Sequence, residues 1–376
     1  MHWKLTFYFL IGAALANEGF LEVPLVAHTV GNQITRRNVA GGTVENLGNF
    51  YYGAKVGVGS PQQKMEIILD TCSSDTLLFT PQSGHPQFFD KKKSSTCQLV
   101  PNQPVFSGSF QPENIAATGN FYRDTAYFYN ARLNLQFALL DKDIPHVFDH
   151  VGGLFGIGGT GLEGTSKKYT NFPAQLVLDG VIDHLGYSIY LNARNESTGT
   201  IVFGGVDTAK YQGDIYWLRN KKPRNTYFGV DVTVNGITQV AMLDTGTQFL
   251  YLSSKIVDSI AESFSGSYDP SKGIVVPNPP KNPEPFLFEF GKAKIYVPYE
   301  DLLADPENHH QLAIFKTSES GGIPLLGSAF LRSAYVVYDF YRNMAAIAQV
   351  KHTTESAIVP LSQEIPHAIQ PSWGRL

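Results

Sequence analysis

Apolar and polar residues alternate with a period of two along much of the chain after residue 50. The pattern is clearest in Lys55–Gly59, Met65–Leu69, Ala126–Tyr129 and Val230–Val234. Because successive side chains of a β-strand point to opposite faces, this period predicts strands that bury one face or both. Most of the chain is therefore expected to form β-sheet.

Helical patterning is confined to two short stretches. The first, Ser253–Phe264, starts with a serine that suits a helix N-terminus and then repeats apolar residues on one face. The second runs from Pro173 to Gly180, since proline is favoured in the first turn of a helix and glycine just beyond its end. The five prolines of Val276–Pro285 predict a loop instead.

Composition narrows the class of protein. The 376 residues include 35 glycines and 22 prolines, with 43% hydrophobic and 16% charged residues, which indicates short strands and tight turns around a substantial core. With 29 basic and 33 acidic side chains the formal charge is -4, which argues against nucleic acid as the main partner. Two cysteines are too few for a zinc-finger array or a disulfide-dense scaffold. What remains is a β-rich protein large enough for two domains.

Residues 1–16 have the pattern of a secretion signal peptide. Lys4 precedes the apolar run Leu5–Leu15, and Ala14-Leu15-Ala16 matches a small-residue cleavage site. The run has about eleven residues, too few to span a hydrocarbon core of ~30 Å. The tail, residues 366–376, lacks the hydrophobic end of a lipid-anchor signal. We therefore expect a secreted protein without a membrane anchor.

Two further features fit the secretory route. Residues 17–37 form a candidate pro-segment that ends at the dibasic pair Arg36-Arg37; the alternative is an ordinary pair of surface arginines. Asn195-Glu196-Ser197 is an acceptor for N-glycosylation in a polar loop, which predicts an accessible sugar site at Asn195.

The chain contains an internal repeat. Leu69-Asp70-Thr71-Cys72-Ser73 recurs as Leu243-Asp244-Thr245-Gly246-Thr247, and each copy follows an apolar run. Downstream, Gly153–Gly156 is echoed by Pro324–Gly327, at 156 − 70 = 86 and 327 − 244 = 83 residues from the aspartates. Upstream, Tyr52-Gly53 is echoed by Phe228-Gly229. The three pairs of matching segments occur in the same order, which predicts two lobes of the same topology, residues 38–215 and 216–365.

Each copy carries one aspartate at the end of an apolar strand, where an isolated charge is costly. If a two-fold axis relates the lobes, Asp70 and Asp244 meet across it and share a proton, because adjacent carboxylates do not both ionise easily. The ionised partner can take a proton from a bound water while the other polarises a carbonyl, so amides are hydrolysed without metal or cofactor. A single aspartate in a strand-end turn is usually structural, but paired copies favour the catalytic interpretation.

The neighbours of the two aspartates have predicted supporting roles. Thr71 and Thr245 are expected to hydrogen-bond across the axis and fix the two loops. Ser73 and Thr247 are placed to hydrogen-bond the outer carboxylate oxygens.

This constellation resembles the pepsin-like aspartic proteases from about Phe50 to Val350. Ile201–Asp207 is similar to the family's inter-lobe strand, and Leu326–Asp339 is similar to a segment of the secreted yeast branch, the candidapepsins and yapsins. The resemblance implies an all-β, bilobal fold of two pseudo-two-fold-related β-barrel lobes with a few short helices. It also implies a cleft for an extended polypeptide substrate and a β-hairpin flap over it.

The chain departs from the family pattern at the site itself. Cys72 replaces the glycine of the first D-T-G, a side-chain-free turn that Gly246 keeps in the second motif. Phe110 replaces the flap tyrosine and removes its hydroxyl, and Ser328 stands where the family usually has aspartate. The family's C-lobe disulfide lacks both partners. Cys72 and Cys97 do not match the usual N-lobe pair and are either bridged to each other or free.

Other motifs carry little functional signal. His309-His310 supplies two of the three to four ligands that a metal needs, so no metal site is expected. Lys91–Lys93 indicates a solvated loop, and Gly152–Gly161 lacks the Lys-Ser/Thr of a phosphate loop. We therefore expect a secreted, monomeric aspartic endopeptidase that works in acid. The alternative is a catalytically impaired homologue that binds peptides, since Cys72 and Phe110 both alter the site.

Overall fold

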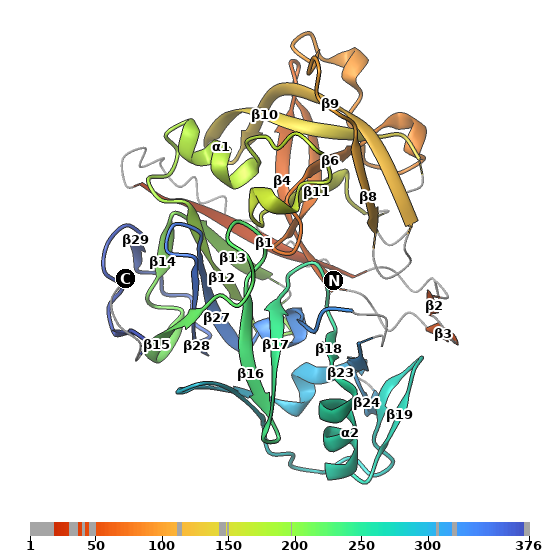
Figure 1. Ribbon diagram of the computed structural model, residues 1–376, viewed down its shortest axis with the longest axis vertical. Coiled ribbons are helices and arrows are strands. Elements are labelled where there is room, and N and C mark those ends of the chain that lie inside the picture. Colours follow the sequence, from red (N-terminus) through yellow and green to blue (C-terminus); the bar gives the residue numbers. More distant parts are fainter. Residues whose placement is uncertain are drawn as a thin grey trace, which may run out of the picture.

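The protein consists of two β-lobes stacked along its long axis (Figure 1). The computed structural model describes residues 19–29, 37–39, 42–44, 50–110, 115–142, 148, 150–196, 198–305, 308–317 and 322–371. Within these ranges there are three short α-helices, α1 (Phe172–Leu178), α2 (Ser254–Ser263) and α3 (Ser328–Leu331), and all other long elements are strands. The predicted all-β, bilobal fold with a few short helices is confirmed.

A closed barrel of six strands forms the N-terminal lobe, drawn in orange and yellow in Figure 1. Pairing between the first and last strands closes the ring. Its strands, in spatial order, are β4 (Phe50–Val58), β5 (Gln63–Asp70), β11 (Gly153–Gly156), β6 (Thr76–Phe79), β10 (Ala131–Leu140) and β9 (Ile115–Phe128). β8 (Phe106–Phe110) pairs with β9 as a hairpin, and β7 (Gln98–Leu99) pairs with β9 further along the same edge.

The C-terminal lobe repeats this strand order. Its sheet runs β16 (Gly229–Val234), β17 (Ile237–Leu243), β26 (Leu325–Leu326), β18 (Leu250–Leu252) and β25 (Ile314–Lys316). β11 in the N-terminal lobe is parallel to β5 and antiparallel to β6. β26 in the C-terminal lobe is likewise parallel to β17 and antiparallel to β18. The repeat in the sequence therefore corresponds to a repeat in topology.

A central sheet joins the lobes. Its strands are β1 (Leu21–Thr29), β13 (Thr198–Phe203), β12 (Gly186–Leu191), β27 (Ala334–Asp339), β28 (Met344–Val350), β15 (Tyr211–Arg219) and β30 (Ala368–Ile369). β15 spans the predicted lobe boundary at 215/216. β1 lies inside the predicted pro-segment and pairs with β13 and β4, with Val23 fully buried. A cut at Arg36-Arg37 would leave β1 held only by non-covalent pairing; Arg36 and the predicted signal, residues 1–16, lie outside the described residues.

Smaller strands complete the architecture. They are β2 (Arg37–Val39), β3 (Gly42–Val44), β14 (Gly205–Asp207), β19 (Ser267–Asp269), β20 (Gly273–Val275), β21 (Phe286–Phe290), β22 (Ala293–Val297), β23 (Leu303–Asp305), β24 (Asn308–Leu312) and β29 (Ile358–Pro360).

Both predicted helices are confirmed with boundaries shifted by one or two residues. Ser253 stands at the N-terminus of α2, and Ile256, Val257 and Ile260 are buried on its inner face, as amphipathic patterning requires. The proline-rich stretch before β21 is a loop, as expected. No helix in the described ranges is both long and apolar enough to cross a bilayer.

Candidate active site

Two crossing strands bring the repeated aspartates together. Asp70 ends β5, and Asp244 directly follows β17. β11 runs behind the first aspartate, where the Ile157 N–H donates to the Asp70 carbonyl at 2.8 Å. β26 runs behind the second, where the Asp244 N–H donates to the Leu326 carbonyl at 3.0 Å. Each aspartate therefore sits at the same point of its lobe.

The crossing requires glycine in both lobes. A Cβ added at Gly156 would lie 2.4 Å from the Ser74 backbone nitrogen, and one at Gly327 would lie 2.4 Å from the Phe249 carbonyl oxygen. Backbone atoms cannot move aside cheaply, so any side chain there would push the aspartate loop out of place. This explains why both copies of the downstream landmark end in glycine.

Thr71 and Thr245 link the two aspartate loops. The N–H of each residue donates to the hydroxyl of the other, at 3.2 Å and 3.1 Å. Each hydroxyl in turn donates to the carbonyl before the opposite aspartate, Thr71 to Leu243 at 2.9 Å and Thr245 to Leu69 at 2.7 Å. Four buried hydrogen bonds across the two lobes thus fix the relative position of Asp70 and Asp244.

The two carboxyl groups are hydrogen-bonded to each other. Backbone amides complete their environment: the Cys72 N–H donates to Asp70 Oδ1 and the Gly246 N–H donates to Asp244 Oδ1, both at 2.8 Å. The Ser73 hydroxyl also donates to Asp70. Thr247 Oγ1 accepts from the Phe249 N–H at 3.3 Å, which stabilises the second loop.

Burial raises the pKa of both carboxyl groups. For Asp70, loss of solvation outweighs the hydrogen bonds from Ser73 and Cys72 that favour the ionised form. For Asp244, burial acts first, and the negative charge of Asp70 raises the pKa further. The pair therefore holds one proton between its members well above the pH at which an exposed aspartate would have lost it.

Cys72 places a thiol against this pair. Its side chain lies against the Asp244 carboxyl of the other lobe, although its backbone belongs to the Asp70 loop. Burial first, and then the charges of Asp244 and Asp70, raise the pKa of this thiol well above its usual value. The sequence left open whether Cys72 and Cys97 are bridged to each other or free; both are free thiols.

Two residues near the site carried no distinct signal in the sequence. Tyr338 of β27 is buried beneath the pair and donates to the Leu243 carbonyl at 3.1 Å. Asn171 donates to the Ser74 hydroxyl at 2.9 Å and so holds the first loop from behind. Tyr338 lies in the segment that resembles the candidapepsins and yapsins, but nothing in its local pattern shows what its hydroxyl contacts.

The predicted flap corresponds to the β8–β9 hairpin. Phe110 is the last residue of β8 and pairs with Ile115. Residues 111–114 and the Phe110 side chain lie outside the described part of the structure. Ser107 ties the hairpin to the lobe, since its N–H donates to the Gly164 carbonyl at 2.7 Å.

Of the remaining candidate residues, Ser328 contacts the second aspartate loop, since its N–H donates to the Thr247 carbonyl at 2.8 Å. Asn195 is exposed in a turn, which leaves its side chain accessible. His310 contacts the Val276 carbonyl through Nδ1 at 2.9 Å. Ser328 is fully buried at the start of α3, with no described partner for its hydroxyl.

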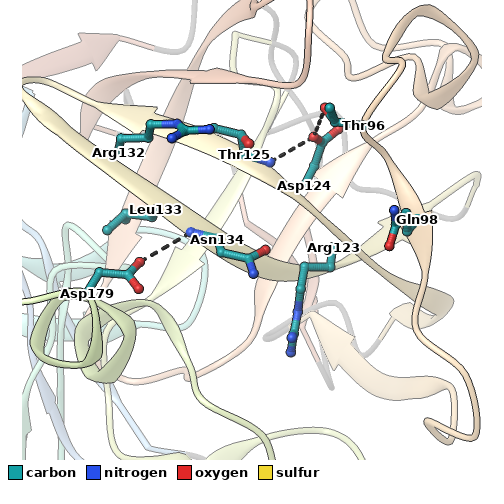
Figure 2. A pocket seen from close by; sticks show the side chains of 9 residues that line it. All are labelled: Thr96, Gln98, Arg123, Asp124, Thr125, Arg132, Leu133, Asn134 and Asp179. Atoms are coloured by element: carbon teal, nitrogen blue, oxygen red, sulfur yellow. Dashed lines mark hydrogen bonds between the residues drawn. The ribbon is translucent and has the colours of Figure 1, made fainter.

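A cavity of about 700 Å³ between β7, β9, β10 and the end of α1 contains neither aspartate (Figure 2). Its polar groups largely bond one another: Thr96 Oγ1 donates to Asp124 at 2.6 Å, and the Asn134 N–H donates to Asp179 at 3.2 Å. Such mutual pairing leaves few groups for a ligand, so this cavity is a poor second candidate.

The two-lobed β-fold, with one buried carboxyl at the same point of each lobe, is the arrangement that the sequence predicts for a protein of the pepsin-like class. The family model for eukaryotic aspartyl proteases matches residues 51–350. Aspartic proteinase yapsin-3 of Saccharomyces cerevisiae is 30% identical over 370 residues, covering 86% of this chain and 71% of that protein. Acid protease of Saccharomycopsis fibuligera is 31% identical over 337 residues, covering 82% of this chain and 83% of that protein. Secreted aspartic protease 3 of Candida albicans is 32% identical over 341 residues, covering 83% of this chain and 82% of that protein.

The chain belongs to the eukaryotic aspartyl protease family and is an aspartic endopeptidase. Its substrates are accordingly polypeptides. The predicted resemblance to the pepsin-like proteases, and to their yeast branch, is confirmed.

Proposed function

We propose that Asp70 and Asp244 are the catalytic pair of this endopeptidase and that they activate a water molecule for attack on the peptide bond. The observation that carries the proposal is the hydrogen bond between two buried carboxyls at equivalent strand ends of two lobes. Neither carboxyl has a described basic side chain as a hydrogen-bond partner, so sharing a proton is the way to reduce their repulsion.

The pair supplies an acid and a base at one point. The ionised carboxylate accepts a proton as the water oxygen bonds to the peptide carbonyl carbon, and the protonated carboxyl donates to the carbonyl oxygen. When the tetrahedral intermediate collapses, the C–N bond breaks and the nitrogen leaves with a proton from the pair. Thr71 and Thr245 hold the two loops, while the Cys72 and Gly246 amides orient the two Oδ1 atoms.

Action in acid and secretion are parts of the same proposal. The raised pKa of both carboxyls supports a shared proton from acid up to near-neutral pH. One relative is named a secreted aspartic protease and another an acid protease. The signal-like residues 1–16 and the exposed acceptor Asn195 fit a protein that enters the secretory pathway as a zymogen and glycoprotein and then acts as a monomer.

One observation favours a second candidate, a homologue that binds peptides with little turnover. The Cys72 thiol occupies space beside Asp244 that a glycine would leave empty. A peptide analogue with a tetrahedral, hydroxyl-bearing carbon at the cleavage position distinguishes the two. Tight binding of the analogue with negligible cleavage supports this second candidate, whereas efficient cleavage by the wild type contradicts it.

The catalytic assignment is tested with a mixed peptide library between about pH 3 and pH 6, the range around an aspartate pKa. Asp70→Asn and Asp244→Asn each remove a proton acceptor or donor, so each is expected to lower kcat by roughly 10²–10⁴-fold. Asp231→Asn is the matched control, because Asp231 lies on the surface with Lys221 as its partner. Turnover by either dyad variant equal to that of the wild type would overturn the assignment.

A further inference from the structure

The two aspartate loops differ at the residue that follows the Asp-Thr pair. Cys72 and Gly246 follow the same Asp-Thr pair, and each donates its N–H to its own aspartate at 2.8 Å. A Cβ built on Gly246 would lie 2.7 Å from Asp70 Oδ1 and 3.0 Å from its Cγ. A side chain at this position is therefore directed at the aspartate of the opposite lobe.

Cys72 carries such a side chain, and it meets Asp244 as this geometry requires. Asp70 already receives a side-chain donor from its own loop, the Ser73 hydroxyl. The thiol provides a side-chain donor to Asp244 from across the axis. Because burial and the two carboxylates keep the thiol protonated, it acts as a donor and not as a nucleophile.

We propose that Cys72 is a positioning residue whose S–H donates to the Asp244 carboxyl and stabilises its ionised form. The role rests on the proposed assignment of Asp70 and Asp244 as the catalytic pair. Cys72 reaches Asp244 from the opposite loop, whereas the Gly246 turn has no side chain to offer Asp70. The thiol thereby lowers the pH at which the pair loses its last proton, and with it the upper pH limit of activity.

The effect of the thiol on the titration of the pair can be measured, because the tyrosines packed around the pair do not titrate in the same pH range. Tyr187 of β12 and Tyr338 of β27 are buried next to the pair, and Tyr227, just before β16, is close enough to Cys72 for their charges to interact. All three phenols have a pKa raised by burial, so they stay neutral wherever the carboxyls titrate. Of the described groups that act on the thiol, only Asp70 and Asp244 change charge between acid and neutral pH.

A spectroscopic test does not depend on cleavage. The chain has two cysteines, so Cys97→Ser leaves Cys72 as the source of the single S–H stretching band. We expect that band at the frequency of a hydrogen-bonded thiol, shifting as the pair ionises, and we expect Asp244→Asn in the same background to remove the shift with pH. Asp231→Asn should leave it intact. A band at the frequency of an unbonded thiol, constant with pH, overturns the proposal even if the protein proves to be a poor protease.

The pH dependence of kcat/KM in variants of Cys72 provides a second test of the proposal. Cys72→Ala removes the donor but keeps the Cβ, so the alkaline limb of kcat/KM should move up by about half a pH unit, as expected for a weak hydrogen bond to a charged group. Cys72→Gly should move it in the same direction. Cys72→Ser retains a donor and should keep the limb at or below its wild-type position. Identical limbs for Ala and Ser would show a merely steric role and overturn the proposal.

Discussion

Thr71 and Thr245 are 174 residues apart in the chain, yet each donates its N–H to the hydroxyl of the other. Both side chains are buried, with 3% and 2% of their surface exposed. Because each hydroxyl also donates to the strand that carries the opposite aspartate, the pair couples the position of one carboxyl to that of the other. The geometry of the site thus depends on this contact between lobes.

Removing either hydroxyl is expected to weaken the whole arrangement. Thr71→Val and Thr245→Val keep the shape of the side chain, but each leaves the buried N–H of the other residue without its acceptor, at a cost of ~1–3 kcal/mol. Thr245→Val also removes the hydroxyl that donates to the Leu69 carbonyl, whereas the Leu243 carbonyl keeps the Tyr338 hydroxyl as a donor in Thr71→Val. Chemical denaturation measures this loss, and kcat should fall with it because the carboxyls are no longer held together.

Thr76→Val is the matched control. Thr76 is fully buried, and its hydroxyl has no partner among the described residues, so its replacement by a methyl group should not lower the free energy of unfolding. The double variant of Thr71 and Thr245 should lose less than the sum of the single losses, since both act on one network. Strict additivity would contradict the coupling.

Activity is expected to disappear as the pH rises through neutrality. Burial and the charge of Asp70 raise the pKa of Asp244 to about 7, so the last proton of the pair leaves near that pH. Hydrolysis needs that proton for the carbonyl oxygen, and kcat/KM should therefore fall above it. A profile measured with a peptide that has no titratable side chains tests this, and a rate that still climbs above that pH would refute the shared proton.

Stability is also expected to fall as the pH rises, for a different reason and from a lower pH. Glu163 is 4% exposed, its Oε2 accepts from the Tyr169 N–H at 2.8 Å, and its Oε1 has no described partner. Burial raises the pKa of Glu163 to about 8 from an ordinary 4.5. The folded state binds this proton more tightly than the unfolded state, so the stabilisation is complete below pH 4.5 and is lost as the pH rises through about 8.

Urea unfolding across that window measures the effect. The slope contributed by one such group is at most about 1.4 kcal/mol per pH unit. Glu163→Gln mimics the protonated side chain and should flatten the slope, with little change in stability at acid pH. An unchanged slope in this variant would mean that Glu163 is not the group that titrates.

Local pattern was sufficient for much of the architecture. The period-two stretches became β4, β5, β9 and β16, and the apolar face of residues 253–264 became α2. The repeat also indicated which two aspartates correspond, because a duplicated strand-and-turn unit leaves its motif in the sequence at equal spacing. These properties depend on residues close together in the chain, so they can be read from it directly.

Contacts between distant segments had to come from the tertiary structure. The sequence showed that Cys72 replaces a glycine, but not that its thiol would reach Asp244 in the other lobe. Nor did it show that Tyr338 lies beneath the pair, or that Glu163 is buried beside Tyr169. Such contacts depend on how the sheets cross and pack, and the pKa of a buried acid depends on the same surroundings, which no local pattern contains.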